Sequence, residues 1–70
     1  MARRDEPFEI CDALLMHERP TSIKISSEQL GDEPVWLPLS QVIDRSEIPE
    51  EGDTGTITIT EWLAIERGWD

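Results

Sequence analysis

The amino-acid sequence predicts one small α+β domain, an antiparallel sheet or partly open β-barrel of about four strands followed by a short C-terminal helix. Residues 22–26 and 56–60 alternate isoleucine with serine, lysine or threonine, which is typical of strands with one buried face and one solvated face. Clusters of glycine, proline and acidic residues separate the apolar segments and indicate turns. Residues 61–67 follow a threonine and precede a glycine, which favours a short capped helix.

The length of 70 residues allows a single domain. Residues 1–7 are mostly charged and are expected to form a flexible N-terminal arm, which leaves residues 8–70 as the domain. The single cysteine excludes an internal disulfide and favours a reducing compartment. No signal peptide follows Met1, and no apolar run has the length needed to cross a bilayer. We therefore expect a cytoplasmic protein that does not bind membranes.

Residues 8–16 fit two templates, a helix that ends before the following proline and a half-buried strand. We favour the strand because residues 19–22 are typical of a turn, and because the alternating residues 22–26 then supply an antiparallel partner. As a strand, this segment is expected to place four side chains on one face: Phe8, Ile10, Asp12 and Leu14.

A further strand is predicted at residues 34–39. Pro34 and Pro38 have no amide donors, so this strand is expected to pair through its other edge or to end its ladder at Pro38. Residues 40–42 are expected to turn out of the sheet. Residues 44–55 are rich in acidic residues, glycine and proline and predict a long exposed loop, of a length typical of functional or mobile loops.

The predicted helix over residues 61–67 has signals at both ends. Thr60 can cap the N-terminus, and Gly68 suits the left-handed position after the C-terminus, where Trp69 is expected to fold back as in a Schellman motif. Two helical turns are not stable alone in water, so the helix must pack on the sheet. Four side chains are expected to supply that contact: Trp62, Leu63, Ile65 and Trp69.

The charge of the chain is strongly negative and unevenly distributed. Sixteen acidic residues stand against six basic ones, for a net charge of -10. Residues 28–53 carry eight acidic side chains against Arg45 alone, for a net charge of -7. Such a field repels phosphate and attracts basic surfaces, which disfavours direct contact with nucleic acid and favours a protein that itself holds nucleic acid. The alternative is that the charge only keeps a small domain soluble.

The acidic side chains of this central segment are the predicted partner-binding residues, because carboxylates on a turn and a loop can present a row of negative charge to arginine and lysine. Binding through such a row is steered at long range and weakened by salt. An exposed tryptophan is expected to serve as the apolar anchor of the interface. The predicted set is Glu28, Asp32, Glu33, Glu47, Glu50, Glu51 and Asp53, with Trp36 as the anchor.

Other chemistries have less support. Cys11 and His17 are too few for a closed zinc site. The acidic residues of the loop lack the spacing of an EF-hand, so no metal site is predicted. No cofactor motif and no catalytic constellation is present, and an enzyme is not expected. The three tryptophans are expected to pack mainly in the core, since stacking on bases requires neighbouring lysine and arginine, which are few.

Two short motifs carry a resemblance. The first is Trp36-Leu37-Pro38-Leu39-Ser40-Gln41, and the second is Glu61-Trp62-Leu63-Ala64 with Gly68. Together they resemble a W-L-P-x-S-Q … W-L-A-x-x-x-G signature of short phage and prophage-encoded proteins of unassigned activity. The resemblance implies a small β-sheet or barrel closed by a C-terminal helix, a phage origin, and no catalytic residues. In size and charge the chain is also similar to anti-CRISPR and other phage inhibitor proteins.

Charge and resemblance together suggest a phage-derived acidic binding protein. We expect it to inhibit a host nucleic-acid-binding protein or defence complex by presenting a DNA-mimicking carboxylate surface. The expected partner is a host protein with a basic nucleic-acid-binding surface. The alternative is a small β-barrel module that binds a protein or its own copy, as in a homodimer, without mimicry. A third hypothesis is weak binding of single-stranded nucleic acid.

Overall fold

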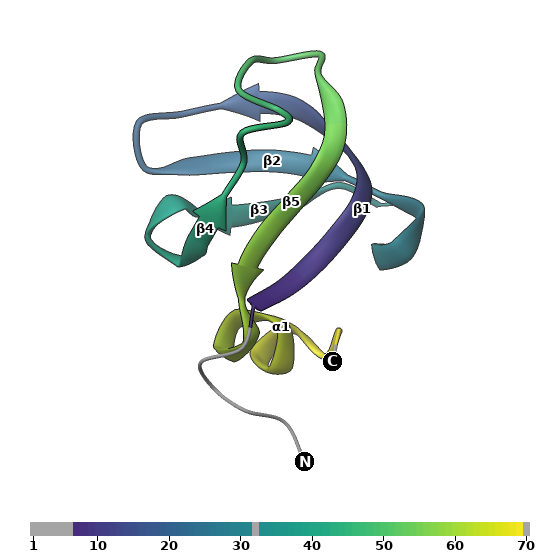
Figure 1. Ribbon diagram of the computed structural model, residues 1–70, viewed down its shortest axis with the longest axis vertical. Coiled ribbons are helices and arrows are strands. Elements are labelled where there is room, and N and C mark those ends of the chain that lie inside the picture. The colour runs from purple at the N-terminus through teal and green to yellow at the C-terminus, as the bar shows by residue number, and fades with distance from the viewer. Residues whose placement is uncertain (1–6, 32, 70) are drawn as a thin grey trace.

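The computed structural model describes residues 7–31 and 33–69, which form an open, five-stranded antiparallel sheet with one short helix (Figure 1). The strand order is β3-β2-β1-β5-β4, which confirms the predicted small antiparallel sheet with a C-terminal helix, with five strands in place of about four. The strands are β1 (Pro7–Glu18), β2 (Ser22–Ser26), β3 (Val35–Pro38), β4 (Val42–Asp44) and β5 (Thr54–Thr60). The helical elements are the 3-10 helices η1 (Glu28–Leu30) and η2 (Leu39–Gln41) and the α-helix α1 (Glu61–Arg67).

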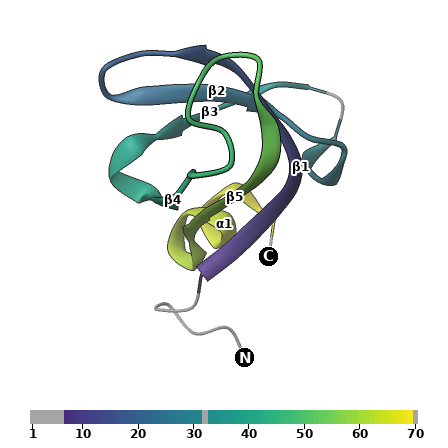
Figure 2. The same ribbon diagram turned by 45° about the horizontal axis from the view of Figure 1, so that its top comes forward.

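The long strand β1 joins the two halves of the sheet. Its first part, from Pro7 to Leu14, pairs with β5, and its last part, from Leu14 to Glu18, pairs with β2. The strand bends between these parts, so that the β2–β3 half and the β5–β4 half curl toward each other (Figures 1 and 2). Residues 8–16 therefore form a strand, and the helical alternative is wrong. Pro7, which was assigned to the flexible arm, begins this strand, and the rest of that arm lies outside the described residues.

A β-bulge at Cys11 and Asp12 changes the face that β1 presents to the core. The pairing with β5 shifts register between Ile10 and Ala13, and Asp12 has a φ of 53°, in the left-handed region. An extra residue in one strand reverses the alternation of side chains beyond it. Ile10, Ala13 and Leu15 are consequently buried, while Asp12 is exposed. The predicted face is therefore wrong after Ile10, because the sequence alternation was continued through the bulge.

The outer edge of β3 is largely closed. The Leu39 backbone N–H donates to the Thr21 carbonyl at 2.9 Å. In this register the backbone N–H and C=O groups of the odd-numbered residues of β3 point toward β2, and those of the even-numbered residues point away from the sheet. Pro38 therefore removes an outward amide, as predicted, and β3 pairs through its other edge only. The outward carbonyl of Trp36 accepts a hydrogen bond from Nη2 of Arg67 at 3.1 Å. This edge offers few groups for pairing with another strand.

Strand β4 is the element that the sequence did not predict. Val42 was expected to lie in a turn, but it pairs with Ile59 of β5, and Asp44 pairs with Thr58. The register shifts between these two pairs, and the intervening Ile43 is 57% exposed. A strand of three residues with a bulge has no alternating pattern long enough to be detected, which is why the prediction was wrong.

The core is aliphatic. Trp69 is partly buried and packs against the core, but Trp62 is 49% exposed and Trp36 is only partly buried, so the expectation that tryptophans pack mainly in the core is wrong for Trp62 and Trp36. The most buried residues of the core come from β1, β2, β3, β5, α1 and the loop before β5. They are Ile10, Ala13, Leu15, Ile23, Ile25, Leu37, Ile48, Ile57, Ile59, Leu63 and Ala64.

The helix α1 packs at the end of the sheet where β1 begins and β5 ends (Figure 1). Oγ1 of Thr60 accepts from the Leu63 N–H at 3.3 Å, and Gly68 adopts the left-handed conformation. The Trp69 N–H donates to the Ala64 carbonyl at 2.8 Å, which confirms the predicted Schellman motif. The buried residues of the helix are Glu61, Leu63 and Ala64. The predicted contacts of Trp62 and Ile65 are wrong, because both side chains face outward, and Ile65 is 44% exposed.

We predict that Ile48→Ala lowers the free energy of unfolding by about 2–5 kcal/mol, because it removes a fully buried side chain from the core. Ile43→Ala is the matched control, since the same side chain is 57% exposed there, and its cost is expected to be within about 0.5 kcal/mol. Urea denaturation of the two variants and the parent checks this. Equal losses at both positions would contradict the burial of Ile48.

Candidate functional site

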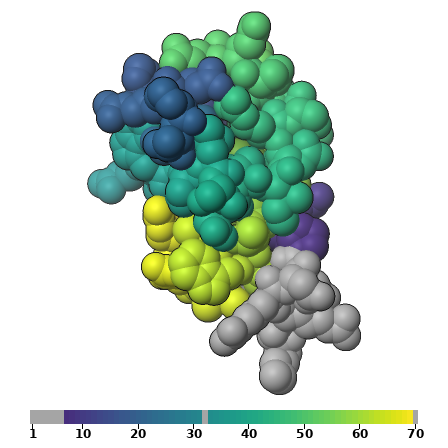
Figure 3. All heavy atoms as spheres, turned by 90° about the vertical axis from the view of Figure 1, so that its left-hand side faces the viewer, coloured from purple at the N-terminus to yellow at the C-terminus, as the bar shows by residue number. Residues whose placement is uncertain are grey.

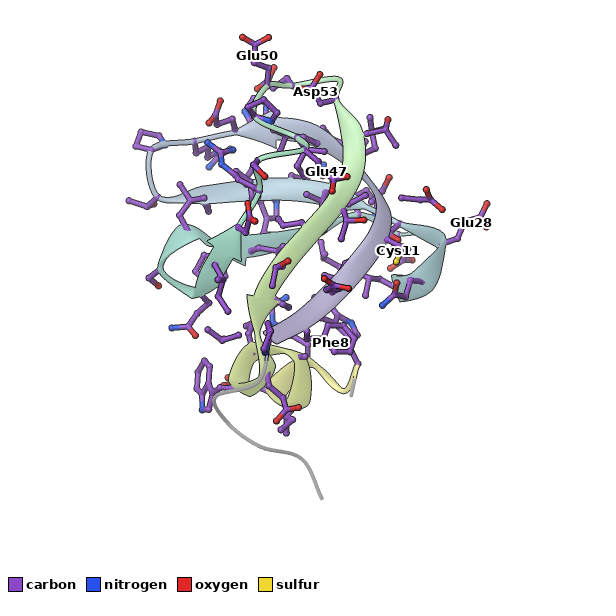
Figure 4. The ribbon with its side chains drawn as sticks, in the orientation of Figure 1. Phe8, Cys11, Glu28, Glu47, Glu50 and Asp53 are labelled. Atoms are coloured by element: carbon purple, nitrogen blue, oxygen red, sulfur yellow. The ribbon has the colours of Figure 1, made fainter. Side chains whose placement is uncertain are left out.

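The segment of residues 45–53, here called the acidic loop, lies at the end of the sheet opposite α1 (Figures 1 and 4). Two backbone hydrogen bonds attach it to β1. The Gly52 N–H donates to the Leu15 carbonyl at 2.8 Å, and the Leu15 N–H donates to the Asp53 carbonyl at 3.0 Å. Ile48, the one apolar side chain that the sequence places there apart from Pro49, is buried beneath it. The loop is therefore folded onto the sheet.

Three of the predicted binding carboxylates also hold this loop together. Oε1 of Glu47 accepts from the Thr56 N–H of β5 at 3.0 Å. Oε2 of Glu51 accepts from the Glu18 N–H at the end of β1 at 2.8 Å. Oδ2 of Asp53 accepts from the N–H of residue 50 at 2.9 Å. A hydrogen bond from a backbone donor fixes the direction of each carboxylate, so these side chains present oriented negative charge.

Glu50 differs from these three residues. Its side chain is exposed, and it makes no hydrogen bond or ion pair with the residues that the structure describes. Figure 4 shows Glu50 and Asp53 at one end of the molecule, with Glu47 below them along β5. The loop thus combines one unengaged carboxylate with three anchored ones, and this end of the molecule is the densest part of the predicted binding set.

The other predicted carboxylates lie elsewhere. Glu28 is the first residue of η1 and lies at the side of the molecule, away from Glu50 in Figure 4. Glu33 is exposed before β3, and Asp32 lies outside the described residues. The chain segment of residues 28–53 is continuous in sequence, but the fold divides its acidic residues between η1, the approach to β3 and the acidic loop. Contact of any of these residues with a partner stays a prediction.

Asp44 marks the start of the acidic loop. Its Oδ1 accepts from the Ser46 N–H at 2.8 Å, and this backbone hydrogen bond, followed by a side-chain hydrogen bond to Ser46, lowers the pKa of the carboxyl. Next to it, Nη2 of Arg45 donates to Oε2 of Glu18 in an ion pair. The first contact fixes the turn at the entry of the loop, and the second holds that entry against the end of β1.

We predict that Asp44→Asn lowers the melting temperature at neutral pH and that this difference from the parent disappears at acid pH. The pKa of Asp44 is depressed in the folded state, so the ionised carboxylate stabilises the fold above the ordinary value of 3.8, and this contribution disappears as the pH falls through the folded value. The asparagine side chain does not titrate. Melting temperatures of parent and variant, measured from neutral to acid pH, should therefore converge. A difference that stays constant would contradict this.

Side chains stabilise the bulge of β1 by forming hydrogen bonds with backbone groups that no neighbouring strand pairs with. Oε1 of Gln29 accepts from the Cys11 N–H at 2.9 Å, and Nε2 of Gln29 donates to the Glu9 carbonyl at 2.9 Å. Oγ of Ser27 donates to the Cys11 carbonyl at 2.6 Å. These bonds cover the edge of β1 that β2 does not reach. Cys11 and His17, the two weak metal candidates, therefore have different surroundings, and no group of three metal-binding side chains occurs among the described residues.

An open hollow of about 210 Å³ lies beside this bulge. It is bounded by the carboxylates of Asp12 and Glu28 and by small polar and backbone groups. No histidine, cysteine or lysine belongs to the lining among the described residues. Its full lining is Asp12, Leu14, Ser26, Ser27, Glu28 and Gly31.

Trp36 is the centre of a group of nitrogen-bearing side chains that the sequence analysis did not anticipate. The predicted shortage of basic residues beside the tryptophans is wrong at this ring. Arg19 lies with Cζ 4.7 Å from the ring centroid, Nζ of Lys24 lies 6.0 Å from it, and the His17 ring packs edge-on with centroids 5.9 Å apart. Together with Arg67, which binds the Trp36 carbonyl, these residues are called the Trp36 patch below.

Strand register explains how the Trp36 patch forms. Lys24 is opposite Trp36 in the β2–β3 pair and opposite His17 in the β1–β2 pair, so the three side chains form a row across three strands. A second irregularity in β1, between Leu15 and His17, places His17 in this row. The nearby turn supplies Arg19. Such a row could have been found only from a correct strand register, which the sequence pattern does not provide.

Comparisons of the chain with protein-family models, with curated proteins and with solved structures found no match. Among the described residues, none of the helices has both the length and the apolar character required to span a bilayer. The acidic loop and the Trp36 patch are therefore the two candidate binding surfaces of the described residues.

Proposed function

We propose that the protein is a phage-derived acidic binding protein that inhibits a host nucleic-acid-binding protein or defence complex. In this proposal the acidic loop occupies the basic surface that normally holds nucleic acid, and the protein acts in the host cytosol by binding alone, without catalysis. The observation that supports this most directly is the anchoring of Glu47, Glu51 and Asp53 by backbone N–H donors. Charges held in this way are ordered before any partner arrives.

Order before binding matters because association requires interface side chains to lose rotamer freedom. A free glutamate side chain loses a large amount of this freedom, whereas an anchored one has already lost it on folding. A net charge of -10 adds long-range attraction to a basic surface and repulsion from nucleic acid that competes for the same surface. The acidic loop therefore suits fast, salt-sensitive binding to arginine and lysine.

The contact set is centred on Glu47, Glu50, Glu51 and Asp53, which come from one loop. Glu28, Asp32 and Glu33 remain proposed contacts at a more lateral position. Trp36 remains the proposed anchor, since it is only partly buried and its patch borders the acidic loop through the pair of His17 Nδ1 and Glu51 Oε2 at 3.4 Å.

We predict that Glu50→Lys weakens partner binding by about tenfold at low salt, because it reverses the one loop carboxylate with no structural role in the described residues. Immobilised parent and variant proteins are used to capture partners from the cytosol of a candidate host. Bound protein is eluted either by raising salt from about 50 to about 300 mM or by adding duplex DNA, and both treatments should release it.

Glu9→Lys is the matched control, because it makes the same change of charge at an exposed position of β1 outside the proposed contact set. It should retain most of the binding that Glu50→Lys loses. Capture that resists both salt and DNA, or that is reduced equally by the two variants, would overturn the mimicry proposal. Melting curves of both variants exclude loss of the fold as the cause.

A second candidate function is supported by the outer face of α1. Trp62 and Ile65 are 49% and 44% exposed and lie three residues apart, so they share one side of the helix. In this reading the protein is a partly open β-barrel that binds a protein or its own copy through an apolar contact, and the acidic residues only maintain solubility. Figure 3 shows α1, in yellow, on the same face of the molecule as η2 and β4, in teal.

If self-association occurs through α1, Trp62→Ser should convert a dimer to a monomer in sedimentation velocity at about 100 μM, with little dependence on salt. Met16→Ser is the control, since Met16 is 43% exposed but belongs to β1 at the other end of the sheet. A parent protein that remains monomeric at this concentration would remove self-association from consideration, while leaving the acidic loop untested by this experiment.

A further inference from the structure

The Trp36 patch concentrates the positive charge of a strongly acidic chain. Arg19 and Lys24 both lie over the same indole ring, and neither forms an ion pair with a carboxylate among the described residues. By contrast, the guanidinium of Arg45 is paired with Glu18. The chain has sixteen acidic residues and six basic ones, so carboxylate partners are plentiful. That two cations lie on one ring without such a partner is therefore a specific feature of the fold.

The remaining members of the patch extend and orient it. Arg67 reaches from α1 to the Trp36 carbonyl, where Nη2 donates at 3.1 Å, and its Cζ also lies 5.8 Å from the Trp69 ring. His17 packs against the edge of the Trp36 ring, with an angle of 88° between the ring planes. Strand β1, the turn after it and β2 therefore place nitrogen groups around the Trp36 ring, and α1 adds Arg67 at the Trp36 backbone carbonyl.

The geometry indicates an anionic ligand. The Arg19 guanidinium lies over the Trp36 ring, so a ligand approaching from solvent meets a guanidinium and the neighbouring Lys24 ammonium, with the indole behind them. An arginine held in this way offers its donors without further loss of freedom, and its planar donors suit phosphate oxygens. Positively charged grooves with aromatic side chains are the usual means of binding single-stranded nucleic acid.

We propose that the Trp36 patch binds the phosphate backbone of single-stranded nucleic acid. Single strands fit better than a duplex because Glu51 contacts His17 and thus limits the patch on one side. In Figure 3 the turn between β1 and β2, in blue, lies directly beside the acidic loop, in green. A duplex lying over the patch would bring its second strand against these carboxylates, whereas a narrow single strand can avoid them.

The net charge of -10 lowers the affinity but does not remove the local site. At physiological ionic strength the Debye length is about 8 Å, so exposed charges farther away than this act weakly on a bound phosphate. The isolated protein is therefore expected to bind a single strand weakly.

The test measures fluorescence anisotropy of a labelled oligothymidine of about 12 nucleotides at about 150 mM salt, where the Debye length is about 8 Å, and repeats it at lower and higher salt to obtain the slope. The parent protein should bind, with a slope of log Kobs against log salt of about -1.4 to -2, as expected for two or three phosphate contacts on a single strand. Arg19→Gln/Lys24→Gln should reduce binding about tenfold or more and flatten this slope by about 1.4.

Arg3→Gln/Arg4→Gln is the matched control, because it removes the same two positive charges elsewhere in the chain. Its binding should stay within about threefold of the parent, as expected if the site is local. Equal loss in the two double variants, or no binding by the parent, would overturn the proposal. So would equally tight binding of a polyglutamate peptide, which would assign the patch to acidic peptides. None of these outcomes depends on capture through the acidic loop.

Discussion

The pairing of β1 with two different strands is the constraint on which the rest of the structure depends. Because β5 takes the first part of this strand and β2 the last part, the sheet must bend where the partners change. The bulge at Cys11 and Asp12 permits that bend, and the side chains of Ser27 and Gln29 bind the backbone groups that it leaves without a strand. The acidic loop then packs against the far end of β1. The position of β1 therefore determines where both candidate surfaces, the acidic loop and the Trp36 patch, lie.

Several parts of the fold followed from local chemistry and were predicted correctly. The alternating isoleucines of β2 and β5, the cap at Thr60, the left-handed Gly68 and the edge proline Pro38 each depend on a residue's own preferences or on a short pattern. These features do not require knowledge of the partner strand. They were sufficient for the class of fold and for the end of the helix.

The errors have a different origin. Bulges occur where two strands of unequal path must pair, so neither the one at Asp12 nor the one before His17 is visible in a single segment. The row of His17, Lys24 and Trp36 depends on the second of these irregularities. For the same reason, the composition indicated only that basic residues are few. The strand register places the acidic loop at one end of the sheet and gathers a small group of basic side chains, the Trp36 patch, beside it.

The burial of Ile48 beneath the acidic loop joins the proposed binding surface to the hydrophobic core. Loops that open independently exchange their amide protons much faster than the core, but this loop cannot open without exposing a core side chain to water. Its protection against hydrogen exchange should therefore approach that of the strands. A partner that holds the loop also holds the whole domain folded, by mass action. Any partner binding at this loop is thus thermodynamically linked to the stability of the fold.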